Sequence, residues 1–150
     1  MFIFINLQDF QNPFGHLDIN INNQIHSYAA YESGNYLIAS SIPSYQRYQR
    51  KKYSITSCAI SVTSSEKSKI LGFYNAQNKT KKATSNNFHN GTIYKINTGK
   101  YKTYKLTSVN CATFVLDGLK SAFNERINYL TYTYKPNNTP SDIFKICQKI

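Results

Sequence analysis

One cysteine of the chain lies where a reactive thiol is expected. Cys111 follows Asn110 and begins a segment in which apolar residues recur at helical spacing. The first turn of a helix carries a partial positive charge and unpaired N–H groups, and both favour a thiolate over a thiol. The sequence therefore predicts that the Cys111 pKa is lowered and that nearby N–H groups can receive an oxyanion. Asn110 is interpreted mainly as the cap of this helix.

A nucleophilic thiol needs a base, and the chain contains three histidines. His89 lies in a polar segment and is interpreted as an ordinary surface residue. His16 opens a predicted strand directly after Phe14-Gly15, so its side chain can face a helix N-terminus that packs on that strand. Spacing alone does not establish a catalytic pair, because His16 and Cys111 are far apart along the chain.

Apolar and polar residues alternate around His16, which predicts a β-hairpin. The apolar side of its first strand consists of Leu17, Ile19 and Ile21. Segment 22–24 has the residue types of a turn, and a second strand is expected over 25–29. The other elements predicted ahead of Cys111 are an entry loop over 12–15, a strand over 53–62, a helix over 65–77, a long polar loop over 78–91, and strands over 93–96 and 101–106.

The clearest helix begins at Cys111, and a second short helix begins at Pro140 after an Asn-Thr pair. Strands accompanied by a few helices favour an α+β fold with a largely antiparallel sheet, and 150 residues fit a single domain over 1–150. The apolar stripe of the first helix consists of Ala112, Val115, Leu116, Leu119, Ala122 and Phe123.

The cysteine count argues against a metal site and against a disulfide framework. The three cysteines, Cys58, Cys111 and Cys147, are an odd number and form no C-x-x-C pair, so at least one thiol is expected to be free. Cys58 and Cys147 are interpreted as small buried apolar residues. No metal and no cofactor is predicted.

The charge of the chain is strongly positive and unevenly distributed. The formal net charge is +11, and all 18 lysines and arginines follow residue 46. They concentrate in 47–52, 79–82 and 95–105, where they predict attraction to an anionic polymer or membrane surface, although a solvated face would look the same. Interleaved Tyr and Lys in the last cluster would also suit nucleic acid, but no nucleic-acid-binding module accompanies them.

The chain contains neither a predicted membrane span nor a recognisable leader. No apolar run approaches the length of a transmembrane helix. The first ten residues, MFIFINLQDF, have no basic segment and too short an apolar run for a signal peptide. The expectation is therefore export by a route that is independent of a signal peptide, or otherwise a cytoplasmic location.

Three motifs in their order along the chain carry a family resemblance. They are Pro13-Phe14-Gly15-His16, the NCATFV segment from Asn110 and the TPSDI segment from Thr139. In this order they resemble the circularly permuted NlpC-like branch of the papain-like cysteine hydrolases, over about residues 12–145. This branch includes lecithin:retinol acyltransferase-like proteins and hydrolase domains of bacterial secreted effectors and Rhs-type toxins. The resemblance implies a central antiparallel sheet packed against the cysteine-bearing helix.

The resemblance also implies a reaction. Cys111 would be the nucleophile and His16 the general base and later the acid, with N–H groups near Asn110 and Cys111 holding the oxyanion. The implied function is an amidase or peptidase acting on peptidoglycan peptides as an effector or toxin, with a cognate immunity protein as a partner. Two alternatives stay open: an acyltransferase or phospholipase using the same pair, and a non-catalytic cationic module that binds nucleic acid or an anionic surface.

The third catalytic residue is less well defined. The family places a polar residue, often a second histidine, opposite the first histidine, and His26 is the obvious candidate. With 22–24 as the turn, His26 shares the face of His16 but lies on the order of 13 Å along the hairpin from it. A bulge in the strand would bring His26 closer. Tyr28 and Asp18, which are expected on the same face, are the other candidates, and a Cys-His dyad is the remaining one.

Overall fold

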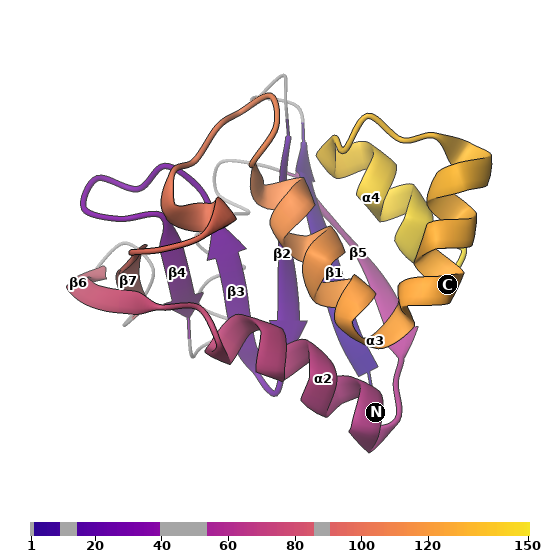
Figure 1. Ribbon diagram of the computed structural model, residues 1–150, viewed down its shortest axis with the longest axis horizontal. Coiled ribbons are helices and arrows are strands. Elements are labelled where there is room, and N and C mark those ends of the chain that lie inside the picture. The colour runs from indigo at the N-terminus through magenta and orange to yellow at the C-terminus, as the bar shows by residue number, and fades with distance from the viewer. Residues whose placement is uncertain (1, 10–14, 40–53, 86–90) are drawn as a thin grey trace.

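A seven-stranded antiparallel sheet forms the centre of the computed structural model, which describes residues 2–9, 15–39, 54–85 and 91–150 (Figure 1). The strands lie in the order β5-β1-β2-β3-β4-β7-β6. The predicted α+β class with an antiparallel sheet is thus confirmed. The strands are β1 (Phe2–Asp9), β2 (His16–Ile21), β3 (Gln24–Tyr28), β4 (Tyr36–Ala39), β5 (Ser54–Ser61), β6 (Lys79–Ser85) and β7 (Gly91–Ile96).

Within the described residues, three α-helices cover one face of this sheet: α2 (Ser64–Asn75), α3 (Cys111–Tyr134) and α4 (Pro140–Cys147) (Figure 1). The helix that begins at Cys111 lies across β2, as predicted (Figure 1). It extends well beyond the predicted stripe and leaves helical geometry at Phe123, where φ is −119° and ψ is 31°. In the described part of the chain, no helix combines the length and the apolar character that a membrane span requires.

The apolar side of β2 and the stripe of α3 form the core between sheet and helices. Leu17 and Ile19 are fully buried in the same cluster as Phe114 and Leu119 of α3. Burial of each such side chain stabilises the fold by about 1.5 to 3 kcal/mol relative to exposure. The core therefore fixes the first turn of α3 against the start of β2, where His16 lies.

The contact between α2 and α3 depends on a glycine. Tyr74 of α2 is fully buried and lies directly over Gly118 of α3. A Cβ atom at position 118 would lie 2.3 Å from the Tyr74 hydroxyl oxygen, so any larger residue would displace the ring. Gly118 thus allows α2 and α3 to approach closely enough to bury Tyr74 between them.

Several predicted elements are confirmed, and two are wrong. The strands at 54–61 and 91–96, the helix at 64–75 and the short helix at 140–147 lie where the sequence placed them. Residues 79–85 form the edge strand β6 and not a loop; Thr80, Lys81 and Lys82 are exposed, so no alternation of burial marks the strand. Residues 101–106 are not a strand, because the segment begins as a 3-10 turn, η2 (Lys100–Lys102), and continues in turns.

Some predictions fall outside the described residues. These are the entry loop at 12–14, the basic run at 47–52, and residues 86–90, which include His89 and part of the predicted loop.

The hairpin turn is one residue shorter than predicted. Asn22 and Asn23 both have positive φ, 53° and 59°, as a two-residue hairpin turn requires. Ile21 therefore pairs with Gln24 and not with Ile25. Because side chains alternate along a strand, this shift by one residue moves every side chain of β3 to the opposite face from the predicted one.

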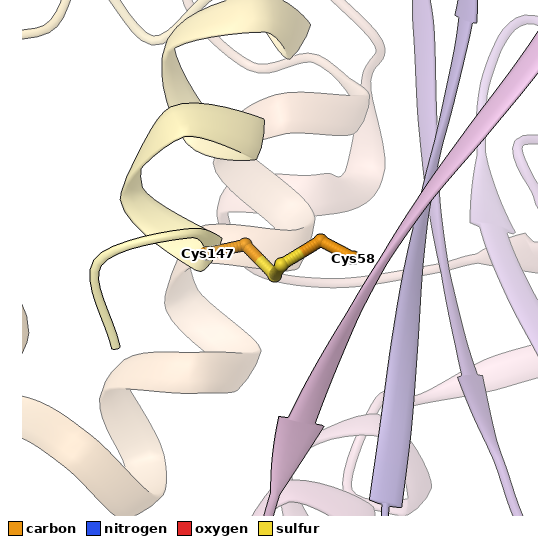
Figure 2. The surroundings of a disulfide bond; sticks show 2 residues. All are labelled: Cys58 and Cys147. Carbon is orange, nitrogen blue, oxygen red and sulfur yellow. A yellow bond between two sulfur atoms is a disulfide. The ribbon is translucent and has the colours of Figure 1, made fainter.

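Cys58 and Cys147 form a disulfide, which corrects the prediction that both are unpaired buried thiols. The bond connects β5 to the last turn of α4 across 89 residues of sequence (Figure 2). The sequence does not indicate this pair, because the two cysteines are far apart along the chain and only the fold brings their Cα atoms to within 6.3 Å of each other. Cys111 is a free cysteine, which agrees with the expectation of at least one unpaired thiol.

Candidate active site

Cys111 is the first residue of α3, and a capping box holds the helix start. The Asn110 side chain accepts a hydrogen bond from the Thr113 N–H at 3.1 Å, and the Thr113 hydroxyl accepts one from the Asn110 N–H at 2.9 Å. Asn110 is thus the N-cap, the role that the sequence favoured for it. The box fixes the backbone N–H groups of the first turn around the sulfur of Cys111.

The Cys111 thiol is buried and protonated at neutral pH. Its residue is only 3% exposed, and burial raises the pKa of the thiol to about 11. Hydrogen bonds from the backbone N–H groups of Leu17, Ala112 and Cys111 itself lower the pKa, but they do not outweigh the loss of solvent. The prediction of a lowered Cys111 pKa is therefore wrong, because a helix N-terminus favours a thiolate less than burial in an apolar core opposes it.

The sulfur of Cys111 lies beside the peptide bond that joins His16 to Leu17. The pairing between β2 and β3 extends from the turn to Asp18 and Ser27 and does not include Leu17, the residue that precedes Asp18. The Leu17 N–H hydrogen-bonds to the Cys111 sulfur. The end of the hairpin ladder thus meets the first turn of α3, and this brings the backbone of His16 next to the thiol.

His16 is held by Ser27, a residue for which the sequence predicts no role in the site. Its Nε2 atom lies 2.7 Å from the Ser27 hydroxyl oxygen, and Ser27 also accepts a hydrogen bond from the Tyr31 hydroxyl at 2.8 Å. Burial lowers the pKa of His16 to about 4, so the imidazole is neutral at neutral pH. When Nε2–H donates to Ser27, the lone pair of Nδ1 is available to accept a proton.

Ser27 could have been identified from the hairpin turn. Two adjacent asparagines favour a two-residue turn, and that turn places Ser27 opposite Asp18. Residues directly opposite in an antiparallel pair share a face, so Ser27 and Asp18 lie on the same side of the sheet as His16. The three-residue turn assumed from the sequence assigned this face to the wrong residues of β3.

His26 lies on the opposite face of the sheet from His16, so the expectation that the two share a face is wrong. It pairs with Ile19, is 1% exposed, and stacks on the Tyr74 ring of α2 at 4.8 Å between centroids. Its Nδ1 atom lies 2.6 Å from the Tyr36 hydroxyl. His26 is thus part of the core beneath α2 and does not orient His16.

Of the other two candidates for the third position, only Asp18 shares the face of His16. Tyr28 is fully buried on the helix side, where its hydroxyl donates to the Tyr101 carbonyl at 3.1 Å. Asp18 is also fully buried and is close enough to Cys111 for its charge to raise the thiol pKa. Asp18 therefore belongs to the surroundings of the thiol, whereas Tyr28 belongs to the core.

A cavity of about 540 Å³ opens at Cys111. It lies between the first turn of α3, the segment before it, and the start of α4, and we call it the Cys111 pocket. All of the described residues that line it are uncharged, although the chain as a whole is strongly basic. They are Gly15, Tyr104, Leu106, Thr107, Asn110, Cys111, Asn137, Asn138, Thr139, Pro140 and Ser141.

The described residues contain no group of three or more histidine, cysteine, aspartate or glutamate side chains placed to hold a metal ion. The Cys111 thiol lines an uncharged pocket, whereas the His16 imidazole is not among the described residues that line it. Leu17 and Ile19 face α3, so the His16 side chain starts from the opposite face of β2, and only the backbone that joins His16 to Leu17 contacts the thiol. Comparisons of the chain with protein-family models, with curated proteins and with solved structures find no match.

Proposed function

We propose that the protein is a cysteine hydrolase in which Cys111 is the nucleophile and His16 is the general base. The observation that carries this proposal is the position of the Cys111 sulfur. It lines a pocket at a helix N-terminus and accepts a hydrogen bond from the N–H of the residue that follows His16. A nucleophile, a base and a group that orients the base, here Ser27, are the parts that covalent catalysis by a thiol needs.

In the proposed reaction both groups start neutral, and the His16 ring must turn toward the helix side of β2 to reach the sulfur. As the sulfur bonds to the substrate carbonyl carbon, Nδ1 of His16 accepts the thiol proton and the carbonyl electron pair moves to oxygen. N–H groups of the first turn of α3 stabilise that oxyanion. The intermediate then expels the leaving group, which takes the proton from His16, and water hydrolyses the thioester to regenerate the thiol.

The papain-like, permuted NlpC-type arrangement is part of this proposal. The antiparallel sheet, the cysteine-bearing helix packed on it and the histidine strand that precedes this helix in the chain support it. In this proposal Ser27, and not His26, orients His16, because Ser27 is hydrogen-bonded to His16 across the hairpin.

The pocket favours an uncharged acyl group next to the reacting carbonyl. Tyr104, Leu106 and Pro140 offer apolar surface, and the neighbouring asparagines and hydroxyls offer hydrogen bonds to peptide groups. These features support an amidase or peptidase, with peptidoglycan peptides as the first substrates to test. The Cys58–Cys147 disulfide supports action outside a reducing cytosol, because such bonds persist mainly in oxidising compartments.

The first prediction concerns the reaction itself. Purified protein is incubated with peptidoglycan and, separately, with phospholipid vesicles, and the products are analysed by mass spectrometry. Cys111→Ala and His16→Ala are each expected to lower product formation by at least about a thousandfold, since they remove the nucleophile and its base. Circular dichroism of each variant serves as the folding control. Undiminished product from Cys111→Ala would show that the nucleophile is another group.

A further inference from the structure

A second cavity lies next to the Cys111 pocket. Its volume is about 360 Å³, and the two cavities share Asn138 in their linings. Unlike its neighbour, it is lined by charged residues. We call it the lysine pocket, after Lys100, Lys120 and Lys135, which line it together with Asp117, Thr113 and Asn138 among others.

The positive charge of the lysine pocket is only partly compensated. Asp117 forms an ion pair with Lys100 at 2.6 Å and also accepts a hydrogen bond from the Tyr101 hydroxyl. Within the described residues, neither Lys120 nor Lys135 is paired with a carboxylate. Two ammonium groups therefore line this cavity with no ion-pair partner among the described residues, whereas the Cys111 pocket beside it has no described charged residue.

We propose that the lysine pocket binds an acidic group, a carboxylate or a phosphate, of the substrate whose carbonyl reacts at Cys111. The link to the substrate rests on the proposed function, whereas anion binding by Lys120 and Lys135 does not. Lysine ammonium groups attract both kinds of oxyanion.

The geometry of α3 sets the distance between the two sites. Asp117 and Lys120 follow Cys111 by six and nine residues, so they lie on the order of 9 to 14 Å from it along the helix axis, and Lys120 is about half a turn around the helix from Cys111. A peptide in extended conformation covers the axial part of this distance in about three or four residues. The inferred substrate is thus an acyl compound, neutral at the reacting carbonyl, with an acidic group at least about three residues away.

The first test measures anion binding without catalysis. ¹H–¹⁵N spectra of the Cys111→Ala protein are recorded during titration with inorganic phosphate or acetate, with chloride at equal ionic strength as the reference. Saturable shifts are expected for the amides of Asp117, Lys120 and Lys135. The variant Lys120→Gln/Lys135→Gln is expected to lose them, and Lys67→Gln/Lys69→Gln on α2, which removes equal charge, is expected to keep them. Comparison of the two anions shows whether the pocket takes carboxylate, phosphate or both.

The second test connects the pocket to the thiol. Cys111 is the free cysteine, so maleimides report on it alone. Maleimidocaproate carries a carboxylate on a flexible chain of suitable length, and its methyl ester is the neutral counterpart. At low ionic strength the acid is expected to react about fivefold faster than the ester with wild-type protein. The ratio is expected to fall to about one in Lys120→Gln/Lys135→Gln and to persist in Lys67→Gln/Lys69→Gln.

The two proposals fail in different ways. An absent phosphate and acetate response, or one that both double variants weaken equally, would overturn the anion site whatever the catalytic result. A retained response together with equal maleimide rates would overturn the link between the lysine pocket and Cys111. If only the hydrolase proposal were wrong, as an active Cys111→Ala protein would show, the response to phosphate and acetate would still be observed.

Discussion

At the Cys111 sulfur, burial and hydrogen bonding shift the pKa of the thiol in opposite directions. Three backbone N–H groups favour the thiolate, but the buried position favours the neutral thiol more strongly. Burial also favours the neutral form of His16, and because the charged form of an imidazole is a cation, its pKa is lowered and not raised. We therefore expect a neutral pair that exchanges a proton during the reaction, and not a preformed thiolate–imidazolium ion pair.

The thiol pKa leads to a prediction about alkylation. Iodoacetamide should modify Cys111 slowly at neutral pH, and the rate should rise about tenfold per pH unit up to pH values near 11, because only the thiolate reacts. Mass spectrometry over about pH 6 to 10 measures this rate.

The same protein unfolded in urea, with its disulfide intact, is the control for this experiment. Its Cys111 rate should level off at a lower pH, near the ordinary pKa of a thiol. A rate in the folded protein that levels off below the unfolded one would contradict the neutral pair and indicate a thiolate.

At the scale of elements, the sequence predicted those whose burial follows a regular period. The stripe of α3 and the alternation of β2 are visible because one side of each packs against the core. β6 shows no such pattern, since it lies at the sheet edge with its central residues exposed. The sequence predicts a turn over 22–24, one residue longer than the observed turn at 22–23, and the shorter turn places Ser27, and not His26, on the face of His16.

The candidate site, too, could be predicted only in part from the sequence. Sequence spacing identified the position of Cys111 at a helix start and of His16 at a strand start. It did not reveal the burial of the thiol, the Ser27 contact or the Cys58–Cys147 bond. Each of these depends on tertiary contacts between segments that are distant along the chain.

The contact between α2 and α3 yields a prediction about stability. Gly118→Ala should lower the free energy of unfolding by about 2 kcal/mol, because the new methyl group would displace the buried Tyr74 ring. Gly72→Ala on α2 is the matched control: its Cβ meets no atom within 4 Å, so helix propensity alone should stabilise the protein by about 1 kcal/mol. Urea unfolding measures both. Equal effects of the two substitutions would refute the proposed role of Gly118.

For the whole molecule, the disulfide and α4 connect stability to the pocket. The bond fixes the last turn of α4 to β5, and the first turn of α4 lines the Cys111 pocket through Thr139, Pro140 and Ser141. Loosening one end of so short a helix should therefore affect the pocket at its other end.

The double variant Cys58→Ser/Cys147→Ser tests this connection. It should lower the free energy of unfolding by about 2 to 4 kcal/mol, because the unfolded chain is no longer constrained by a long covalent loop. Thermal unfolding with and without reductant measures the effect. Cys111→Ser is the control and should remain as sensitive to reductant as the wild type. A double variant as stable as the wild type would show that the bond adds nothing to the fold.

The covalent loop has a further consequence for a chain that is cut by a protease. Any single backbone cleavage between Cys58 and Cys147 leaves two fragments that the sulfur–sulfur bond still holds together. Such a nicked molecule would migrate as one band on a denaturing gel and separate into two only after reduction. Both halves of the proposed active site, one contributed by β2 and the other by α3, would thus stay in one covalently joined particle after the cut.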